Sequence, residues 1–306
     1  MLVPSPLVAG LVGSIVTGAL GLNLATAASN VKVMSLNVRT SRAPDPCPVG
    51  CWEYRQWRFK TFLESTSPDF LAVQETAPDQ VLFIQTQLGY TSTGECAGEC
   101  QSEERNSIFY KADRFRLLTS QTFALSDTPA VLPSNTWNLE YLRAAVVARF
   151  LDLSSNVEIC MLNTHYDISR GQNQSSVLVA NLLKEHCQFN DAVFMTGDLN
   201  HTPEGPAVQY LLGNVEINNQ RTPFPLYETL TAVGAGGPTW IGPSFGVELT
   251  GIKFDYILAR AERRTCLLRG AVLAGTVNNN SISDHAAVLS EFCLGDGCTN
   301  CVAQAS

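Results

Sequence analysis

The stretch AVFMTGDLN, residues 192–200, joins an apolar β-type run to Gly197, Asp198 and Asn200. This pattern predicts a strand that ends in a polar loop, where a rigid scaffold can hold functional side chains. The plainer interpretation is an ordinary β-turn, because Gly, Asp and Asn all favour turns. The apolar run before Asp198 and two comparable strings elsewhere in the chain favour a functional site.

Those other strings are QET at residues 74–76 and SDH at residues 283–285, and each follows or adjoins a β-type run. Together they place carboxylates at three expected strand ends, with an amide and an imidazole beside them. Oxygen ligands of this kind select Mg²⁺, with Mn²⁺ or Ca²⁺ as alternatives, over softer metals. The set suits a hard divalent cation and a phosphate ester.

The chain has 306 residues, 45% of them hydrophobic, and a formal net charge of −8. A single large α/β domain of this length is common, and no repeat or low-complexity linker divides the sequence. The acidic balance argues against a sequence-independent grip on nucleic acid, which needs clustered Lys and Arg. It leaves open a nuclease that neutralises phosphate with a bound metal.

The first 27 residues carry no charged side chain and end in Ala25-Thr26-Ala27, which suits signal peptidase. We therefore expect a signal peptide over residues 1–27, a catalytic domain over residues 28–306, and secretion. The competing interpretation is a membrane anchor, because the apolar stretch is nearly long enough to span a bilayer. After cleavage we expect no membrane span, and we expect a monomer.

Ten cysteines support export, since an even count in an exported chain indicates disulfides. Three pairs are close in sequence, at positions 47/51, 96/100 and 298/301, but the connectivity stays open. Zinc or redox use is the weaker alternative, because the CxxC at 298–301 has no accompanying histidine pair. Sequons at Asn173, Asn200 and Asn279 permit N-glycosylation, although Asn200 falls in the expected site.

Strand-like runs recur along the chain, at residues 31–38, 70–74, 106–110, 144–151, 157–163, 192–196, 254–259, 266–274 and 287–293. Helical periodicity occurs at residues 53–65, 172–187 and 205–212. Many strands and few helices predict two packed sheets with helices outside. A loop over residues 231–251, rich in Gly and Pro, should rim the site because it leads into Asp255.

Along the chain, the polar side chains that can serve phosphate chemistry come in this order: Asn37, Glu75, Tyr110, His165, Asp198, Asn200, Asp255, Asp284 and His285. This order, with LNVR at residues 36–39 and the final SDH, resembles the endonuclease/exonuclease/phosphatase superfamily. That superfamily includes DNase I-like nucleases, abasic-site endonucleases, inositol-phosphate phosphatases and neutral sphingomyelinases. The resemblance covers residues 31–292.

Further stretches resemble the compact metal-dependent hydrolase branch: NSIFY at 106–110, FALS at 123–126, RAAVVAR at 143–149, THYD at 164–167 and PEGPA at 203–207. The resemblance implies an α/β fold of DNase I type. This is a four-layer α/β sandwich, two packed mixed β-sheets flanked by helices, with the site at one edge of the sheets.

Metal binding is assigned to Glu75 as the principal ligand and to Asp284, directly or through water, because Mg²⁺ keeps several of its waters. Asn37 is placed beside them. The alternative is that Glu75 is an ordinary surface carboxylate at the end of a strand and binds no metal.

Asp198 is the expected general base, oriented by Asn37 and tuned by burial near other carboxylates. His285 and His165 should contact the scissile phosphate, with Asp255 accepting the second ring N–H of His285. A buried histidine is more often a satisfied core residue, which is the alternative for both.

Tyr110, Asn200 and Arg143 are placed as further donors to the phosphate or the transition state, whereas His201 and His186 receive no catalytic role. No carboxylate that would orient His165 is identifiable, although Asp167 shares its strand face. The basic surface of abasic-site endonucleases is not evident, and neither is a hydrophobic hairpin for membrane docking.

The sequence therefore predicts a secreted, divalent-metal-dependent phosphoesterase that cleaves phosphodiester bonds, with nuclease action on DNA or RNA as the first hypothesis. The alternative is a phosphatase or phosphodiesterase acting on a small phosphate ester or a lipid headgroup, as a sphingomyelinase does. A secreted binding protein without catalysis is the alternative from another class. Fold analogy does not decide among them.

Overall fold

The structure, a computed structural model, describes residue 1 and residues 27–98, 105–246, 248–249, 251–261 and 264–302. The expected signal peptide falls on residues 1–27, almost all of which lie outside the described part. Within the described part, no helix combines the length and apolar character that crossing a membrane requires.

The first of two six-stranded sheets has the order β11-β14-β1-β2-β4-β3. Its strands are β1 (Ser29–Asn37), β2 (Phe70–Gln74), β3 (Thr91–Thr93), β4 (Ile108–Tyr110), β11 (Thr265–Leu273) and β14 (Ala287–Leu294). β1 runs parallel to β2 and antiparallel to β14, so the sheet is mixed.

The second sheet has the order β5-β6-β7-β8-β10-β9. Its strands are β5 (Phe115–Ala124), β6 (Ala144–Asp152), β7 (Val157–His165), β8 (Ala192–Asp198), β9 (Tyr227–Glu228) and β10 (Asp255–Ala259). β7 and β8 are parallel and the other pairs are antiparallel. A separate hairpin joins β12 (Thr276–Val277) to β13 (Asn280–Ser281).

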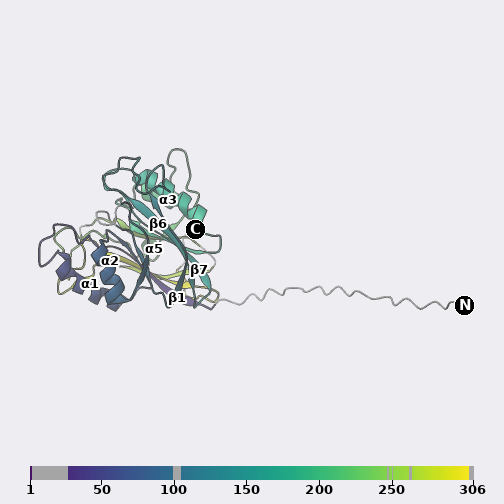
Figure 1. Cartoon of the computed structure of the whole chain (residues 1–306), viewed down its shortest axis with the longest axis horizontal. Coiled ribbons are helices and arrows are strands. Elements are labelled where there is room, and N and C mark those ends of the chain that lie inside the picture. The colour runs from purple at the N-terminus through teal and green to yellow at the C-terminus, as the bar shows by residue number, and fades with distance from the viewer. Residues whose placement is uncertain (2–26, 99–104, 247, 250, 262–263, 303–306) are drawn as a thin grey trace.

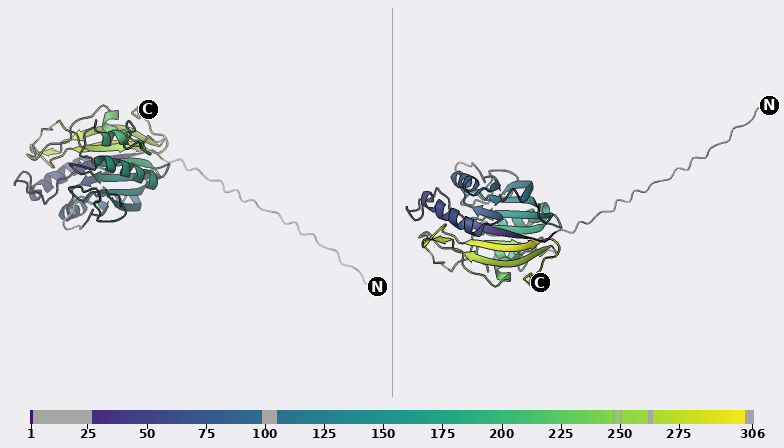
Figure 2. Two further views of the ribbon diagram at one scale, coloured as in Figure 1. Left: turned by 90° about the horizontal axis from the view of Figure 1, so that it is seen from above. Right: turned by 90° about the horizontal axis from the view of Figure 1, so that it is seen from below.

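The two sheets pack face to face, and Figure 2 shows the yellow strands β11 and β14 lying beside the purple β1 within the first sheet. The core between them is apolar and takes residues from both sheets, with Phe70 from the first and Phe150 and Phe194 from the second. Side chains alternate between the two faces of a strand, so the other face of each sheet needs its own cover.

Helices provide that cover. α1 (Trp52–Thr66) and α2 (Pro78–Leu88) bury apolar side chains against the first sheet, while α3 (Gln172–His186) and α4 (Pro206–Leu211) cover the second. Figure 1 shows α1 and α2 on one side of the strands and α3 on another. The short α5 (Thr229–Ala232) follows β9. The predicted four-layer α/β sandwich of DNase I type is confirmed.

The strand and helix predictions agree with the structure for all the runs named from sequence, with shifts of a few residues at their ends. Two longer elements were missed. β5 is an edge strand with a register shift between Leu117 and Thr119, and its exposed middle hides the alternation. α2 begins at Pro78 and ends before Gly89, which are both ordinary helix boundary signals.

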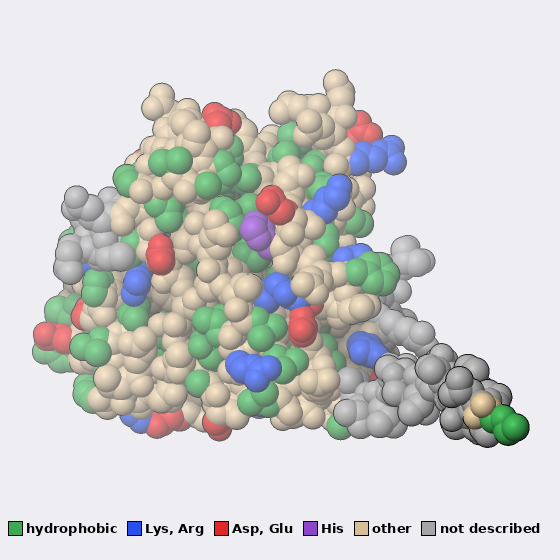
Figure 3. Space-filling model, turned by 45° about the vertical axis from the view of Figure 1, so that its right-hand side comes forward, with side chains coloured by type: hydrophobic (Ala, Val, Ile, Leu, Met, Phe, Trp, Pro, Cys, Tyr) green, Lys and Arg blue, Asp and Glu red, His purple; other side chains and the backbone are tan. Residues whose placement is uncertain are grey.

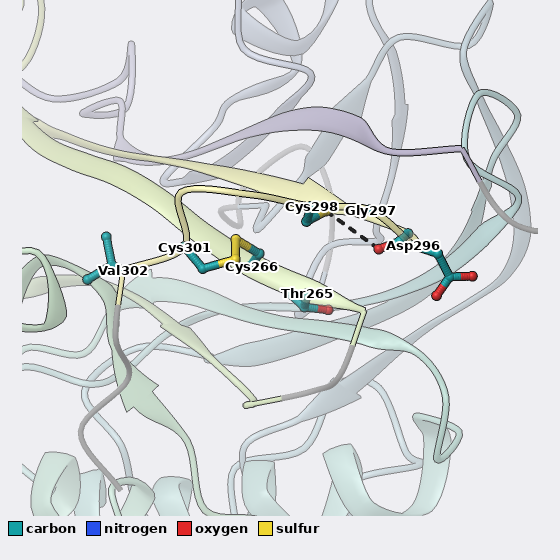
Figure 4. A pocket seen from close by; sticks show the side chains of 8 residues that line it. Thr265, Cys266, Asp296, Gly297, Cys298, Cys301 and Val302 are labelled. Carbon is teal, nitrogen blue, oxygen red and sulfur yellow. Dashed lines mark hydrogen bonds between the residues drawn. A yellow bond between two sulfur atoms is a disulfide. The ribbon is translucent and has the colours of Figure 1, made fainter.

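Four disulfides join described cysteines: Cys47–Cys51, Cys160–Cys187, Cys266–Cys301 and Cys293–Cys298. Cys96 is also disulfide-bonded, and none of the described cysteines is free. Cys298 and Cys301, close in sequence, therefore pair with different partners. Figure 4 shows the Cys266–Cys301 bond fastening the C-terminal segment to β11.

Candidate active site

The register of the strands brings the predicted site residues to one edge of the two sheets. In the first sheet Asn37 lies opposite Gln74, next to Glu75. In the second sheet Asp198 lies opposite both His165 and Asp255. Because β1 also packs on β8 and β10, the polar ends of the two sheets meet. With residues 284–285, where His285 contacts Asp255, six segments distant in sequence converge on one site.

Asn37 connects the two halves of this site. Its amide nitrogen donates to Glu75 Oε1 at 2.8 Å and to Asp198 Oδ2 at 3.0 Å. Its amide oxygen accepts the backbone N–H of Arg39 at 2.9 Å. Two carboxylates from different sheets are therefore held by one buried amide, as expected for Asp198. Metal coordination by Asn37 itself stays a prediction.

Glu75 holds an unusual backbone conformation directly after β2. Its φ is 64°, in the left-handed region that costs energy for a residue with a Cβ. The side chain is only partly buried, and its Oε2 accepts the Thr40 N–H at 3.2 Å. The carboxylate is thus fixed at the rim of the site, where a hydrated cation can reach it.

Asp284 lies on the same rim and is held by two neighbours. Ser283 Oγ donates to its Oδ1 at 3.2 Å, and Arg39 Nε lies 3.7 Å from its Oδ2. Burial raises the pKa of Asp284, and the nearby charge of Glu75 raises it further against the opposing effects of His285 and Arg39. Arg39 is also paired with Asp45 at 2.9 Å, inside the segment that leads to the Cys47–Cys51 bond.

The donor set fits a hard divalent cation. Glu75, Asp198, Asp255 and Asp284 bring four carboxylates together, and Asp255 Oδ1 is buried with no hydrogen-bond partner among the described residues. Arg39 is shared with Asp45, so negative charge is in excess and a bound cation would offset it. That Glu75 and Asp284 hold such an ion stays a prediction.

Asp198, Asp255 and His285 also come close enough to share an ion, with candidate ligand atoms within 4.8 Å of one another. Their hydrogen bonds favour another role. His285 Nδ1 lies 2.8 Å from Asp255 Oδ2, and Asp198 Oδ2 already accepts from Asn37. We therefore assign these three to proton handling and leave the half-exposed Glu75 side to the cation.

Asp198 has the surroundings expected of a general base. It is almost completely buried, and its Oδ1 accepts the Asn200 N–H at 2.9 Å. Burial raises its pKa, and Asp255 raises it further, while the two histidines and the Asn37 hydrogen bond act in the opposite direction. A carboxylate that is made more basic but stays hydrogen-bonded in place is suited to take a proton from water.

His285 is oriented by Asp255, as predicted, with its Nε2 facing Asp198 Oδ2 at 3.7 Å. Burial alone would lower its pKa, but Asp255 and Asp198 outweigh burial and raise the pKa well above the ordinary value. The ring also meets Trp240 edge-on, with centroids 5.3 Å apart. His285 is thus held as a cation at the site.

The pKa of His165 is shifted in the opposite direction from that of His285. Its Nδ1 lies 2.8 Å from Arg143 Nη1, so that nitrogen accepts and Nε2 carries the hydrogen, 3.5 Å from Asp198 Oδ2. Burial and then the Arg143 charge lower the pKa of His165 to about 4, so the ring is neutral near pH 7. The amide nitrogen of Asn200 lies 3.1 Å from Nε2 and donates instead to Tyr166 O at 2.9 Å, because both nitrogens of the close pair carry hydrogen.

The partner of His165 is therefore an arginine and not a carboxylate. Arg143, predicted as a phosphate donor, instead fixes the tautomer of His165 from a buried position. Asp167, on the same strand face in the sequence, accepts backbone N–H groups of Tyr141, Ser169 and Arg170 and shapes the loop after β7.

Tyr110 is the one predicted residue that the structure removes from the site. It lies opposite Phe70, at the start of β2, whereas Glu75 follows the end of that strand. At about 3.3 Å per strand residue this is about 16 Å away. Its ring packs on Phe150 in the core, with centroids 4.9 Å apart. The placement of Tyr110 as a phosphate donor was wrong because a run of β residues does not show which end reaches the site.

Sequence reasoning missed several supporting residues. Thr239 Oγ1 accepts the backbone N–H groups of Phe254 and Asp255, at 3.0 and 3.1 Å, and so fixes the start of β10. Trp240 follows it and contacts His285. Both lie in the Gly- and Pro-rich loop that was expected to rim the site. In the sequence, the only hint of this role was the pair Thr239-Trp240 within that loop.

Comparisons with known proteins bear on the family and the fold. Residues 34–285 match the Endonuclease/Exonuclease/phosphatase family. Nocturnin of Drosophila melanogaster is 25% identical over 179 residues, which cover 53% of this chain and 26% of that protein. The chain thus spans only about a quarter of the length of this relative.

Solved structures share the fold at low identity. A mannosyl-6-phosphatase of Bacteroides thetaiotaomicron is 20% identical with a TM-score of 0.73, covering 86% of this chain and 99% of that one. D. rerio TDP2, complexed with a single-strand DNA product, is 15% identical with a TM-score of 0.64, covering 86% of this chain and 99% of that one. These likenesses concern the fold alone.

Proposed function

Since the chain belongs to the endonuclease/exonuclease/phosphatase family, we propose that it is a secreted, divalent-metal-dependent hydrolase of phosphate esters. The observation that carries the proposal is the Asn37 bridge. One amide joins Glu75, which would hold the cation, to Asp198, which would deprotonate the attacking water.

Asp198 accepts the proton of the water that attacks phosphorus, and Asn37 and the Asn200 N–H keep its two oxygens in position. His285, held as a cation by Asp255, donates to the charge that develops on the phosphoryl oxygens. As the P–O ester bond breaks, the leaving oxygen takes a proton from solvent and Asp198 returns its proton to solvent. Neutral His165 donates from Nε2 on the other side of Asp198.

A divalent cation at Glu75 and Asp284, most simply Mg²⁺, supplies Lewis-acid polarisation of the phosphoryl group when bound. Mn²⁺ and Ca²⁺ share the preference for oxygen ligands. Arg39 remains beside Asp284 to balance its charge.

A small ester, or the exposed end of a chain, is the substrate that fits best. Many cations are paired with carboxylates, including Arg39, Lys111, Arg114, Arg149 and Lys253. On the face in Figure 3, Lys and Arg side chains are separated by other residue types and form no continuous band. Without such a band, tracking along a nucleic-acid backbone has little support.

Cleavage of DNA or RNA is the second candidate. It is favoured by the DNA product bound to the structurally similar TDP2 and by the two buried histidines that can stabilise a diester transition state. The four disulfides among the described residues support the extracellular part of the proposal. We expect the mature protein to act as a monomer.

Hydrolysis of plasmid DNA, single-stranded RNA, bis-p-nitrophenyl phosphate and p-nitrophenyl phosphate by the mature protein tests the proposal. Each substrate is incubated with Mg²⁺, Mn²⁺ or EDTA, next to the His285→Ala variant. Metal-dependent cleavage that the variant lacks supports a phosphoesterase, and the pattern over the four substrates separates polymers from small esters. Absence of all four activities would favour a binding protein.

A further inference from the structure

A cavity opens beside the candidate active site. It measures about 370 Å³ and is formed by three segments, at residues 202–204, 236–238 and 251–253, with one further side chain from Thr231. Its size falls within the range of small-molecule sites, about 300–1,000 Å³. None of the catalytic side chains assigned above lines it.

Each of the three segments runs directly into the catalytic machinery. Thr202 follows Asn200 by two residues, Pro238 precedes Trp240 by two, and Lys253 precedes Asp255 by two. Two residues of extended chain span at most about 7 Å, so the lip of the cavity lies that close to the site.

Hydrogen bonds tie these segments to one another. The Thr239 and Trp240 N–H groups donate to Ile252 O at 2.8 and 3.0 Å. Tyr256 Oη donates to His201 O at 2.8 Å, which fixes the 202–204 segment to β10. The cavity is therefore built on the same rigid elements that hold Asp255 and His285.

The floor of the cavity is polar but electrically balanced. Lys253 is buried, and its ammonium group is paired with Glu228 Oε1 at 2.9 Å. Glu228 also accepts from the hydroxyl of Thr231. No cation is therefore left over in the floor to attract a second phosphate group.

The rim offers an acceptor and apolar walls. Glu204 is exposed, and its carboxylate forms no hydrogen bond or ion pair with the described residues. Pro203, Pro238 and Ile252 provide aliphatic surface. A carboxylate acceptor combined with aliphatic walls suits an uncharged ring that carries hydroxyl groups on its edge and C–H groups on its face, and it disfavours an anion.

We propose that this cavity is a subsite for the hydroxylated, uncharged part of the substrate, such as the sugar ring of a sugar phosphate, whose phosphate lies at Asp198. The inference rests on the proposed phosphoesterase function and names its substrate class. Glu204 accepts hydroxyl hydrogens of the ring, and the prolines and Ile252 cover its face.

Gly236 and Gly237 make the subsite testable. A Cβ at either position would meet no atom within 4 Å, and neither glycine needs the left-handed conformation. A side chain can therefore start at either position without a clash at Cβ. Gly236→Leu and Gly237→Leu are made separately, so that a side chain is tested at each of these two positions in the cavity wall. Gly246→Leu is the matched control, with only an ordinary 3.6 Å contact and no place in the cavity wall.

The experiment measures binding of hexose 6-phosphate and of n-hexyl phosphate, which lacks the ring hydroxyls, by calorimetry with Mg²⁺. An Asp198→Asn background prevents turnover. We expect about 10-fold tighter binding of the hexose ester, the effect of about two hydrogen bonds. Glu204→Ala and at least one leucine variant should reduce this preference to within about 2-fold, while Gly246→Leu keeps it.

Equal binding of the two esters, or a preference that survives Glu204→Ala and both leucine variants, would overturn the subsite. Failure of the function itself is seen separately, as absence of metal-dependent hydrolysis of both p-nitrophenyl esters by the protein with Asp198 intact. If that hydrolysis is present and the preference is absent, the phosphoesterase stands without the subsite.

Discussion

The amide nitrogen of Asn37 lies 3.0 Å from Asp198 Oδ2, across the interface between the two sheets. The same nitrogen also donates to Glu75 Oε1 at 2.8 Å. A change at Asn37 should therefore disturb the metal side and the base side of the site together.

Asn37→Ala should lower kcat/KM by about 10–100-fold and weaken Mg²⁺ binding by a similar factor, as loss of a residue that orients metal ligands usually does. Steady-state kinetics and a calorimetric Mg²⁺ titration measure the two effects. Asn30→Ala is the control, since Asn30 bonds only Glu291 in an exposed position. A variant with normal metal affinity would show that Asn37 serves Asp198 alone.

Asp255→Asn should lower kcat by about 10²–10⁴-fold and change KM much less, because Asp255 orients His285 and sustains its charge. The carboxylate is fully buried and the amide nearly isosteric, so the fold should persist by circular dichroism. A variant that retained wild-type kcat would remove His285 and Asp255 from the mechanism as we describe it.

The lowered pKa of buried His165 predicts that the folded protein loses stability in acid. Its pKa is lowered to about 4 in the folded protein against 6.5 for the free side chain, so the unfolded chain binds a proton more readily. This pKa difference contributes to the free energy of unfolding in full above pH 6.5. The contribution is lost as the pH falls towards 4, by about 3 kcal/mol in total. Urea denaturation across this range should show the decline, and His165→Gln should flatten it. An equally steep decline in the variant would assign it to other groups.

Arg55 is a buried guanidinium whose hydrogen bonds within the described residues all go to backbone carbonyls, and it also lies 5.3 Å from the ring centroids of Trp52 and Phe245. It donates to Gly50 O, Val38 O, Ile282 O and Arg39 O, and burial lowers its pKa to about 10. It therefore joins the end of β1 to the segment before Asp284. Arg55→Met leaves these acceptors unsatisfied and should cost at least about 3 kcal/mol of unfolding free energy.

Urea denaturation measures the effect of Arg55→Met. The exposed Arg116→Met is the control and should stay within about 0.5 kcal/mol of the unchanged protein. A small loss for Arg55→Met would mean that water replaces the guanidinium without a cost to the fold.

Sequence alone predicted most of the strands because their apolar runs are short, β-branched and bounded by polar strings. It also predicted which polar residues gather, since strand ends of parallel pairs meet at one edge, as for Asn37 with Glu75 and His165 with Asp198. The exposed middle of β5 and the boundary signals of α2 were passed over.

Pairings between side chains were less accessible from sequence. The pairing of Asp255 with His285 was predicted correctly. Arg143 was predicted to contact the phosphate, but it contacts His165. Tyr110 was placed at the site when the antiparallel register of β4 puts it at the far end of β2. Register and side-chain direction depend on the tertiary fold, which residue types alone do not specify.

The most direct test of the central claim is the rate of bis-p-nitrophenyl phosphate hydrolysis with saturating Mg²⁺ by the mature protein and its Asp198→Asn variant. Asp113→Asn, on an exposed surface, serves as the control. The account predicts activity that EDTA abolishes, a loss of about 10²–10⁴-fold in kcat for Asp198→Asn, and none for the control. Hydrolysis that persists in EDTA, or an Asp198→Asn variant with near-normal kcat, would contradict it.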